Sequence, residues 1–138
     1  MSKIYSQGTF GAYSHLAALE IEPNAEVIPC KTFDECFVKA SSESGSRMVI
    51  PESNRITGNI GIEYLIFKYR LNIYAEHFQK IEHNLLGQQE SSLKDIKNVF
   101  SHTQGLSQCS NFIKKNNFIE HVRADTAGSA EAISKKKN

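Results

Sequence analysis

The sequence has little of several residue types and patterns that mark specialised classes of protein. It has no tryptophan and only three cysteines in 138 residues. Cys30, Cys36 and Cys109 include no close pair of the kind that structural zinc sites use, so we expect reduced thiols. No apolar run is long enough to cross a bilayer, and residues 1–10 lack the basic start and apolar stretch of a secretory signal. These absences predict a cytoplasmic protein.

An excess of either charge is also missing. Sixteen lysines and arginines face fifteen acidic residues, which leaves a net charge of +1. Nucleic-acid-binding surfaces and polybasic membrane contacts need a concentration of positive charge. We therefore expect neither nucleic acid nor a membrane as a partner.

Metal and dinucleotide motifs are absent from the sequence as well. The five histidines form no HExxH motif and no cluster with the cysteines. Gly8 and Gly11 lack the third glycine and the later acidic residue of a dinucleotide fingerprint. The sequence predicts no metal and no cofactor. His102, between a predicted strand and a helix, is interpreted either as a polar pocket wall or as a surface imidazole.

What the sequence does contain is an alternation of apolar segments at strand spacing and at helix spacing. Its 40% of hydrophobic residues can fill a core. The alternation predicts an α/β fold. The expected strands cover residues 4–5, 27–28, 48–50, 71–75, 81–86, 99–100 and 122.

Helix starts are marked by capping residues. Ser14 suits the N-cap of a first helix. Thr32 and Glu35 form a capping box, in which the threonine hydroxyl accepts from the third helical N–H and the glutamate reaches back to the cap. That helix should begin at Phe33. A further helix is expected over residues 62–69.

Two more helices are expected in the last third of the chain. The helix after Ser101 should turn one apolar face inward, made of Leu106, Cys109, Phe112 and Ile113. On that face Cys109 is an inert core thiol. The last helix starts at Thr126 and ends in the lysine run 135–137, which we interpret as a solvated helix end.

Three segments share one design, in which a strand leads into small and hydroxyl residues and then into a helix. They are residues 7–14, 101–106 and 125–130. Each places backbone N–H groups at a helix start beside hydroxyls or amides, and such helix starts bind carboxylates or phosphates. Any one segment is explained as well by helix capping. The three together describe a receptor for a small anion.

In order and spacing, these segments resemble the prephenate dehydratase family over essentially the whole chain. Residues 7–14 are similar to the family's start and 29–33 to its second strand and helix, while 83–86 match its His-x-Leu-Leu strand. Residues 101–109 resemble its Ser-His-Pro-Gln-Ala-Leu-x-Gln-Cys segment, with threonine and glycine in place of the proline and alanine. Residues 125–130 resemble its Thr-Ala-rich loop.

The resemblance implies a two-lobed α/β fold like that of type 2 periplasmic binding proteins, with the active site between the lobes. Residues 1–74 would form the first lobe and 75–138 most of the second, with no ACT domain. Members of the family dehydrate and decarboxylate prephenate to phenylpyruvate, on the route to phenylalanine, without a metal or organic cofactor. A substrate with two carboxylates needs N–H and hydroxyl donors, and its departing hydroxyl needs a proton.

The resemblance implies four substrate contacts, Asn54, Ser101, Gln104 and Thr126, with Asn54 on the opposite side of the cleft. Capping or loop hydrogen bonding is the alternative for each.

The segment around Asn54 departs from the family's Pro-x-Glu-Asn-Ser-x-x-Gly pattern. Here residues 51–58 read Pro-Glu-Ser-Asn-Arg-Ile-Thr-Gly, so Ser53 replaces the glutamate and Arg55 the serine. Glu52 is a poor substitute for the missing acid, because adjacent residues of an extended segment face opposite ways.

The Thr-Arg-Phe motif that is thought to supply the family's general acid is absent from this sequence, so no catalytic residue is assigned. The family continues beyond the position of Asn138, and the chain is expected to be truncated relative to it. Lost sheet partners would leave apolar edges that favour association, and the family's habit suggests a homodimer.

Two functions follow from the resemblance. The chain is a prephenate dehydratase, or it is an inactive fragment that only binds a small aromatic carboxylate or serves as a dimerisation surface. An unrelated solute-binding domain is disfavoured by the order of the motifs and by the missing export signal.

Overall fold

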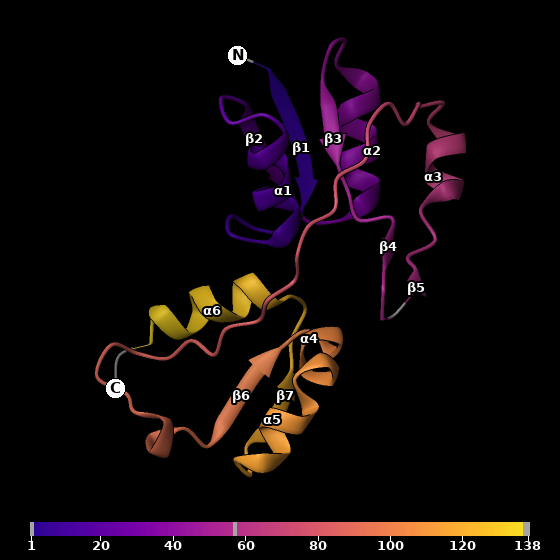
Figure 1. Ribbon diagram of the computed structural model, residues 1–138. Helices are drawn as coiled ribbons and strands as arrows, with labels where there is room; N and C mark the ends of the chain where they lie inside the picture. Colours follow the sequence, from indigo (N-terminus) through magenta and orange to yellow (C-terminus); the bar gives the residue numbers. More distant parts are fainter. Residues whose placement is uncertain (1, 57, 137–138) are drawn as a thin grey trace. The chain divides into compact units, whose positions relative to one another are not determined.

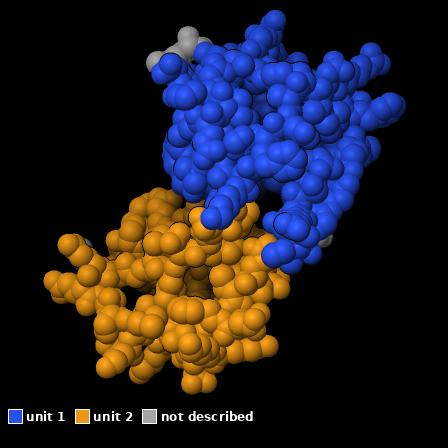
Figure 2. Space-filling model, in the orientation of Figure 1, with its two compact units in different colours: residues 1–80 blue, residues 81–138 orange. Residues whose placement is uncertain are grey.

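The computed structural model describes residues 2–56 and 58–136, which divide into two compact units. Unit 1 covers residues 1–80 and unit 2 covers residues 81–138 (Figure 2). Each unit has its own sheet and its own buried residues, and each is described by itself. The lobe boundary expected near residue 74 stays a prediction.

Unit 1 is built on a parallel sheet with the strand order β2-β1-β3 (Figure 1). The strands are β1 (Lys3–Gln7), β2 (Glu26–Cys30) and β3 (Arg47–Val49), and both pairings are parallel. These strands confirm the predicted segments around residues 4–5, 27–28 and 48–50.

Two helices cover opposite faces of this sheet, α1 (Tyr13–Ile21) and α2 (Phe33–Ser42). Successive side chains of a strand point to opposite faces. Ile4 accordingly packs with Ala18 of α1, and Tyr5 packs with Cys36 of α2. Alternation within β1 thus gives unit 1 an apolar core on both sides of its sheet.

The two predicted helix starts of unit 1 had different outcomes. Helix α2 begins at Phe33 as predicted, and the Thr32 hydroxyl accepts from the Glu35 N–H at 3.1 Å. The Glu35 carboxylate accepts from the Lys31 N–H instead of the cap residue's own N–H. The prediction for Ser14 was wrong, because Gly11 takes a positive φ of 84° and the chain turns helical right after Ala12, which has no side-chain cap.

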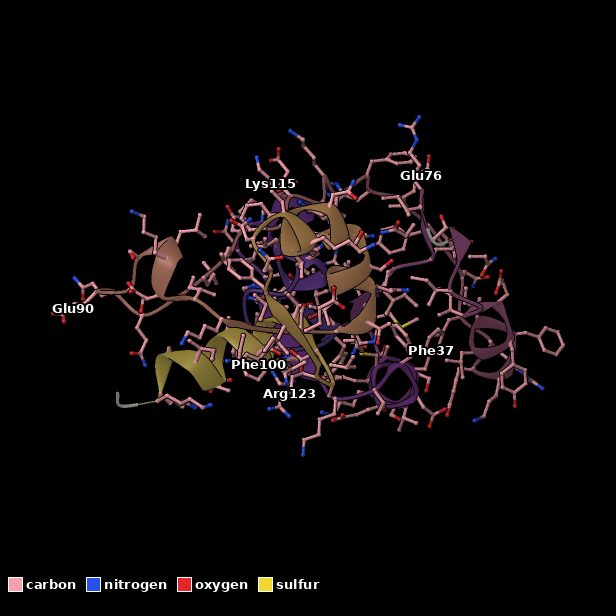
Figure 3. All side chains as sticks on the ribbon, turned by 90° about the horizontal axis from the view of Figure 1, so that it is seen from below. Phe37, Glu76, Glu90, Phe100, Lys115 and Arg123 are labelled. Atoms are coloured by element: carbon pink, nitrogen blue, oxygen red, sulfur yellow. The ribbon has the colours of Figure 1, made fainter. Side chains whose placement is uncertain are left out.

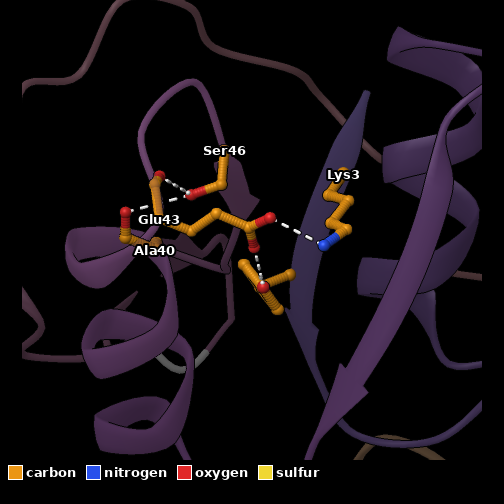
Figure 4. Close-up of polar contacts among 5 residues, drawn as sticks. Lys3, Ala40, Glu43 and Ser46 are labelled. Carbon is orange, nitrogen blue, oxygen red and sulfur yellow. Dashed lines mark hydrogen bonds and ion pairs between the residues drawn. The ribbon is translucent and has the colours of Figure 1, made fainter. Parts of the chain in front are cut away.

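A polar cluster ties the end of α2 to β1. The Glu43 carboxylate, at the C-cap of α2, accepts from the Lys3 ammonium at 2.6 Å and from the Tyr5 hydroxyl (Figure 4). The hydrogen bond from Lys3, followed by that from Tyr5, lowers the pKa of Glu43, and the bond to Glu43 raises the pKa of Tyr5. The Ser46 hydroxyl donates to the Ala40 and Glu43 carbonyls and closes the turn.

The rest of unit 1 holds a hairpin and a short helix. The hairpin consists of β4 (Ser53–Asn54) and β5 (Gly58–Asn59), and α3 (Glu63–Lys68) falls within the predicted helix over residues 62–69. The strand predicted over residues 71–75 does not form. Leu71 packs on the core of unit 1, as expected for an apolar residue. However, no described strand forms hydrogen bonds with residues 71–75. Alternating apolar residues form a strand only when a second backbone segment pairs with them.

Unit 2 is built on a two-stranded parallel sheet of β6 (Asn98–Ser101) and β7 (Ile119–Val122). Between the strands run α4 (Thr103–Gln108) and α5 (Ser110–Lys115), and α6 (Thr126–Ser134) follows β7. A turn of 3₁₀ helix, η1 (Leu93–Asp95), precedes β6. The start of α6 agrees with the prediction, while Lys137 of the terminal lysine run lies outside the described residues.

Two predictions for unit 2 were wrong. The segment 81–86 is not a strand, since neither β6 nor β7 bonds to it. Phe112 is 45% exposed because the helix breaks at Cys109, which turns Phe112 away from the core. The buried residues of this side are Val99, Leu106 and Ile113, with Cys109 half-buried against them. Throughout the described residues, no helix is long and apolar enough to span a membrane.

Candidate functional site

Two hydroxyl groups meet at the carboxyl end of the sheet of unit 2. Ser101 is the last residue of β6, and the connection after β7 leads through residues 123–125 to Thr126 at the start of α6. The carboxyl ends of parallel strands lie at one edge of a sheet, where open α/β folds bind ligands. Ser101 Oγ and Thr126 Oγ1 are accordingly 2.9 Å apart, and either atom can be the donor.

Neither hydroxyl is used as a helix cap. The N-cap of α6 is Asp125, whose carboxylate accepts from the Gly128 N–H. The N-cap of α4 is His102, whose Nδ1 accepts from the Gln104 N–H at 3.3 Å. Capping therefore does not explain Ser101 and Thr126, while loop hydrogen bonding, the other alternative, is met by the bond between their two hydroxyls. The imidazole of His102, which we could not assign from sequence, is exposed and caps α4.

A glycine leaves room for the hydroxyl pair. A Cβ at Gly105 would lie 2.7 Å from Ser101 Oγ and 3.4 Å from Thr126 Oγ1. The first distance is shorter than van der Waals contact allows, so a side chain here would displace the serine hydroxyl. Gly105 was noted in the sequence only as a replacement of the family's alanine, and its contact with the hydroxyl pair was not predicted.

Gln104 lies in the first turn of α4 and is exposed. Its backbone N–H bonds to His102, and no hydrogen bond joins its side chain to Ser101 or Thr126 among the described contacts. Its amide is therefore available to a ligand. Gln108 Oε1, at the other end of α4, accepts from His83 Nε2 at 2.6 Å. This bond joins two segments that both resemble family motifs.

Asn54 lies in unit 1, as the last residue of β4 before the turn to β5. Its Oδ1 accepts from the Ile56 N–H at 2.9 Å, which fixes the side chain over the turn and leaves the amide group as a donor. Ser53, Arg55 and Glu52 beside it are exposed. The expectation that Asn54 faces the other three residues across a cleft stays a prediction. Thr57 of this segment lies outside the described residues.

The loop over residues 7–14 has a hydroxyl that sequence patterns could not single out. Gly8 and Gly11 take positive φ angles of 109° and 84°, which only glycine adopts without strain. Within this turn, Thr9 Oγ1 is buried and has no hydrogen-bond partner among the described residues. A buried hydroxyl without a partner costs stability, so a polar ligand group that reached it would be stabilised.

The thiols are not candidates for nucleophilic chemistry. Cys30 and Cys36 are 1% and 0% exposed, and burial, followed by a hydrogen bond with Cys30, raises the pKa of Cys36. Burial also raises the pKa of Cys109. Thiolates are therefore disfavoured at Cys36 and Cys109. Among the residues in view, no group of three or more metal-ligating side chains comes together.

Taken together, the end of β6 and the start of α6 offer hydrogen-bond donors to an anion. The paired hydroxyls can reorient toward a carboxylate. The exposed Gln104 amide lies three residues after Ser101 in the sequence. The two ionisable residues nearest to them in the chain, His102 and Asp125, are engaged as caps. This arrangement suits recognition and charge stabilisation, whereas proton donation is left without an assigned residue.

Comparison with known proteins gives one consistent family. The family described as "Prephenate dehydratase" matches residues 4–138. A curated relative, "Arogenate dehydratase 2" of Petunia hybrida, is 37% identical over 95% of this chain and 34% of its own length.

Two solved structures are similar as well. The prephenate dehydratase of Staphylococcus aureus has a TM-score of 0.69 at 25% identity, over 97% of this chain and 52% of its own. A structure described as "GqqA- a novel type of quorum quenching acylases" has a TM-score of 0.82 at 32% identity, over 95% of this chain and 48% of its own. These matches confirm the predicted two-lobed α/β fold class. The chain spans about half of each solved chain and about a third of the curated relative.

Proposed function

The chain belongs to the prephenate dehydratase family, and from that premise we propose that it serves the decarboxylating dehydration of prephenate to phenylpyruvate in the synthesis of L-phenylalanine. The observation that carries this proposal is the Ser101–Thr126 hydroxyl pair at the carboxyl end of β6. We assign residues 1–74 to the first lobe and residues 75–138 to most of the second. The substrate would bind between the lobes.

In this proposal the described residues recognise and orient the substrate. Ser101 and Thr126 donate to one carboxylate, and Gln104 and Asn54 donate to the polar groups around the ring. Hydroxyl and amide donors suit an anion whose charge must be stabilised while the ring loses water and carbon dioxide. The general acid that protonates the departing hydroxyl is not assigned to any residue of this chain.

The choice of prephenate over arogenate rests on charge. Relatives are named for arogenate alone or for both substrates. Arogenate carries an ammonium group where prephenate carries a ketone. In the hairpin that holds Asn54, Glu52 keeps a negative charge beside Ser53, which replaces the family's glutamate, and Arg55 adds a positive charge. The added arginine favours the more anionic substrate, because it makes the field at the hairpin more positive.

Acyl transfer, the activity named for one structural relative, is not part of the proposal. An acylase needs a nucleophile activated by a neighbouring base. The partner of the Ser101 hydroxyl is the Thr126 hydroxyl rather than an imidazole. No described contact of Ser101 favours the acylase reaction.

Location and assembly stay predictions. Relatives from Arabidopsis thaliana are named as chloroplastic, whereas a cytoplasmic location was expected for this chain. A homodimer is proposed from the family's habit. The proposed reaction needs no metal or organic cofactor.

The test measures prephenate binding by calorimetry and phenylpyruvate formation by absorbance with the purified 138-residue chain, corrected for the spontaneous acid-promoted reaction. We expect the double variant Ser101→Ala, Thr126→Val to weaken binding by at least tenfold, since two donors are lost at about 1 kcal/mol or more each. Ser107→Ala is the matched control, because this exposed serine lies on the same helix α4 and should leave binding unchanged.

Each outcome decides between the two functions. Binding with turnover above the background supports the enzyme. Binding without turnover identifies the fragment that only binds an aromatic carboxylate. Equal prephenate affinity in the folded double variant contradicts the proposed site.

A further inference from the structure

Unit 2 contains a cavity that shares no residue with the Ser101–Thr126 pair. It measures about 270 Å³ and lies between α6 and the face of the sheet opposite Ser101. Small residues of α6, Gly128, Ser129 and Ala132, leave this space open where they face the sheet, and Phe100 and Ile133 provide larger apolar walls. The volume is slightly below the range for small-molecule sites, which begins at roughly 300 Å³.

Two cations lie at this cavity beside a single aromatic ring. The Arg123 guanidinium is 5.1 Å and the Lys136 ammonium 5.5 Å from the centroid of the Phe100 ring. Figure 3 shows Phe100 and Arg123 as neighbours at the strands of unit 2. Both contacts are cation–π distances, and both residues line the cavity. Both charges therefore contribute to a positive potential around the Phe100 ring.

The positive charge at the cavity is only partly neutralised by the surrounding protein. Among residues 2–56 and 58–136, no carboxylate forms an ion pair with Arg123 or Lys136. Asp125 also lines the cavity, and its carboxylate accepts from the Gly128 N–H as the cap of α6 and keeps its negative charge, so the two cations leave one positive charge in excess. Two like charges near one ring repel each other, and a bound anion would remove that repulsion.

A residue outside the cavity holds the Phe100 ring in place. His121 stacks on it with ring centroids 4.7 Å apart and planes at 18°. The imidazole is itself fixed by a 2.8 Å hydrogen bond from its Nε2 to Asn98 Oδ1. Phe100 is thus held in place on β6, while Arg123 directly follows β7 and Lys136 follows α6. A wall that is already ordered lowers the entropic cost of binding.

We propose that this cavity binds a small aryl carboxylate, with the ring against Phe100 and Ile133 and the carboxylate between Arg123 and Lys136. Arginine binds carboxylates with two parallel hydrogen bonds, and lysine adds a point charge. The volume accepts one ring with a short acid chain. The site is separate from the proposed prephenate site and does not depend on it, because the two sites share no residue.

The test titrates phenylacetate into the ¹⁵N-labelled 138-residue chain and follows the amide signals. We expect saturable shifts at Gly128, Ser129 and Ala132. The double variant Arg123→Gln, Lys136→Gln should bind at least tenfold more weakly. Lys135→Gln is the matched control, because Lys135 is already paired with Glu131 and should leave the affinity unchanged. Circular dichroism establishes that each variant is folded.

Two further probes separate the ring from the charge. Benzyl alcohol lacks the carboxylate and acetate lacks the ring, and each should bind at least tenfold more weakly than phenylacetate. Shifts confined to Ser101, Gln104 and Thr126 would place the ligand at the other site and overturn the proposal. Absence of saturable binding, or equal affinity in the folded double variant, overturns it as well.

Discussion

Units 1 and 2 differ in how completely they bury their apolar side chains. The largest fully buried side chains, Phe37, Ile4, Cys30, Cys36 and Ser6, all belong to unit 1. The core of unit 2 consists of three buried residues on one face of a two-stranded sheet. The paired hydroxyls and the cationic cavity both belong to unit 2. Stability is thus concentrated in one part of the chain, and the best-defined binding groups lie in the other.

The largest expected effect tests whether unit 1 is the stable part. Phe37 is 0% exposed and packs on Tyr69 with ring centroids 5.7 Å apart. Phe37→Ala should lower the free energy of unfolding by about 3–5 kcal/mol, because it removes a large buried ring and leaves a cavity. Urea unfolding measures the loss. Val38→Ala on the same helix is the control, since Val38 is 43% exposed. If both variants lowered the free energy of unfolding equally, the burial of Phe37 would not be the main source of stability in unit 1.

A substitution in unit 2 should separate binding from stability. Gly105→Ala places a methyl group against the Ser101 hydroxyl and should break its bond to Thr126. Prephenate affinity is then expected to fall on the order of tenfold, while the helix gains up to about 1 kcal/mol of propensity. Calorimetry and thermal unfolding measure the two effects. Unchanged affinity would mean that the hydroxyl pair is not used in binding.

The cap of α2 should have a smaller effect on stability. Thr32→Ala removes the acceptor of the Glu35 N–H and should cost about 1 kcal/mol. Chemical unfolding measures the loss, and Thr32→Ser is the conservative control that keeps the hydroxyl. A serine variant as unstable as the alanine variant would show that the hydroxyl is not the stabilising group.

The smallest expected effect concerns the Glu43 cluster and depends on pH. Hydrogen bonds from Lys3 and Tyr5 lower the pKa of Glu43, so its contribution is present above its pKa in the unfolded chain and is lost as the pH falls through the lower folded value. The pKa of Tyr5 and of Lys3 is raised, so their contributions are present below their unfolded values and are lost at alkaline pH as the pH rises through the higher folded values.

Glu43→Gln should therefore flatten the dependence of stability on pH at both the acid and the alkaline limits. Unfolding measured from acid to alkaline pH tests this expectation. The exposed pair of Lys135 and Glu131 in unit 2 offers a control variant, Lys135→Gln, that leaves the Glu43 cluster in place. A Glu43→Gln profile parallel to that of the unchanged chain would contradict the role of the cluster.

Local signals were sufficient for most of unit 1. The capping box at Thr32 placed the start of α2 because its chemistry lies within four residues, and apolar spacing located β1, β2 and β3. Ser14 was misjudged because the positive φ of Gly11, which no spacing encodes, decides where α1 starts. The strand expected over residues 71–75 failed because pairing depends on a second segment of backbone.

For the candidate site, the sequence located the loops but not their contacts. The three strand-to-helix segments identified Ser101 and Thr126, yet their 2.9 Å contact depends on the parallel pairing of β6 with β7. The closeness of Gly105 to the two hydroxyls and the buried hydroxyl of Thr9 depend on side-chain packing that residue spacing does not encode. The inward face assigned to Phe112 failed because the break at Cys109 interrupts the helical period.

The backbone over residues 72–87, which joins the two units, is held by neither sheet. Nearly all of its residues are exposed, and it has no helix or strand. Proteases cut where extended, accessible backbone can enter their active sites. Limited digestion should therefore cut within this stretch first and release two fragments, one with the β2-β1-β3 sheet and one with the β6-β7 sheet.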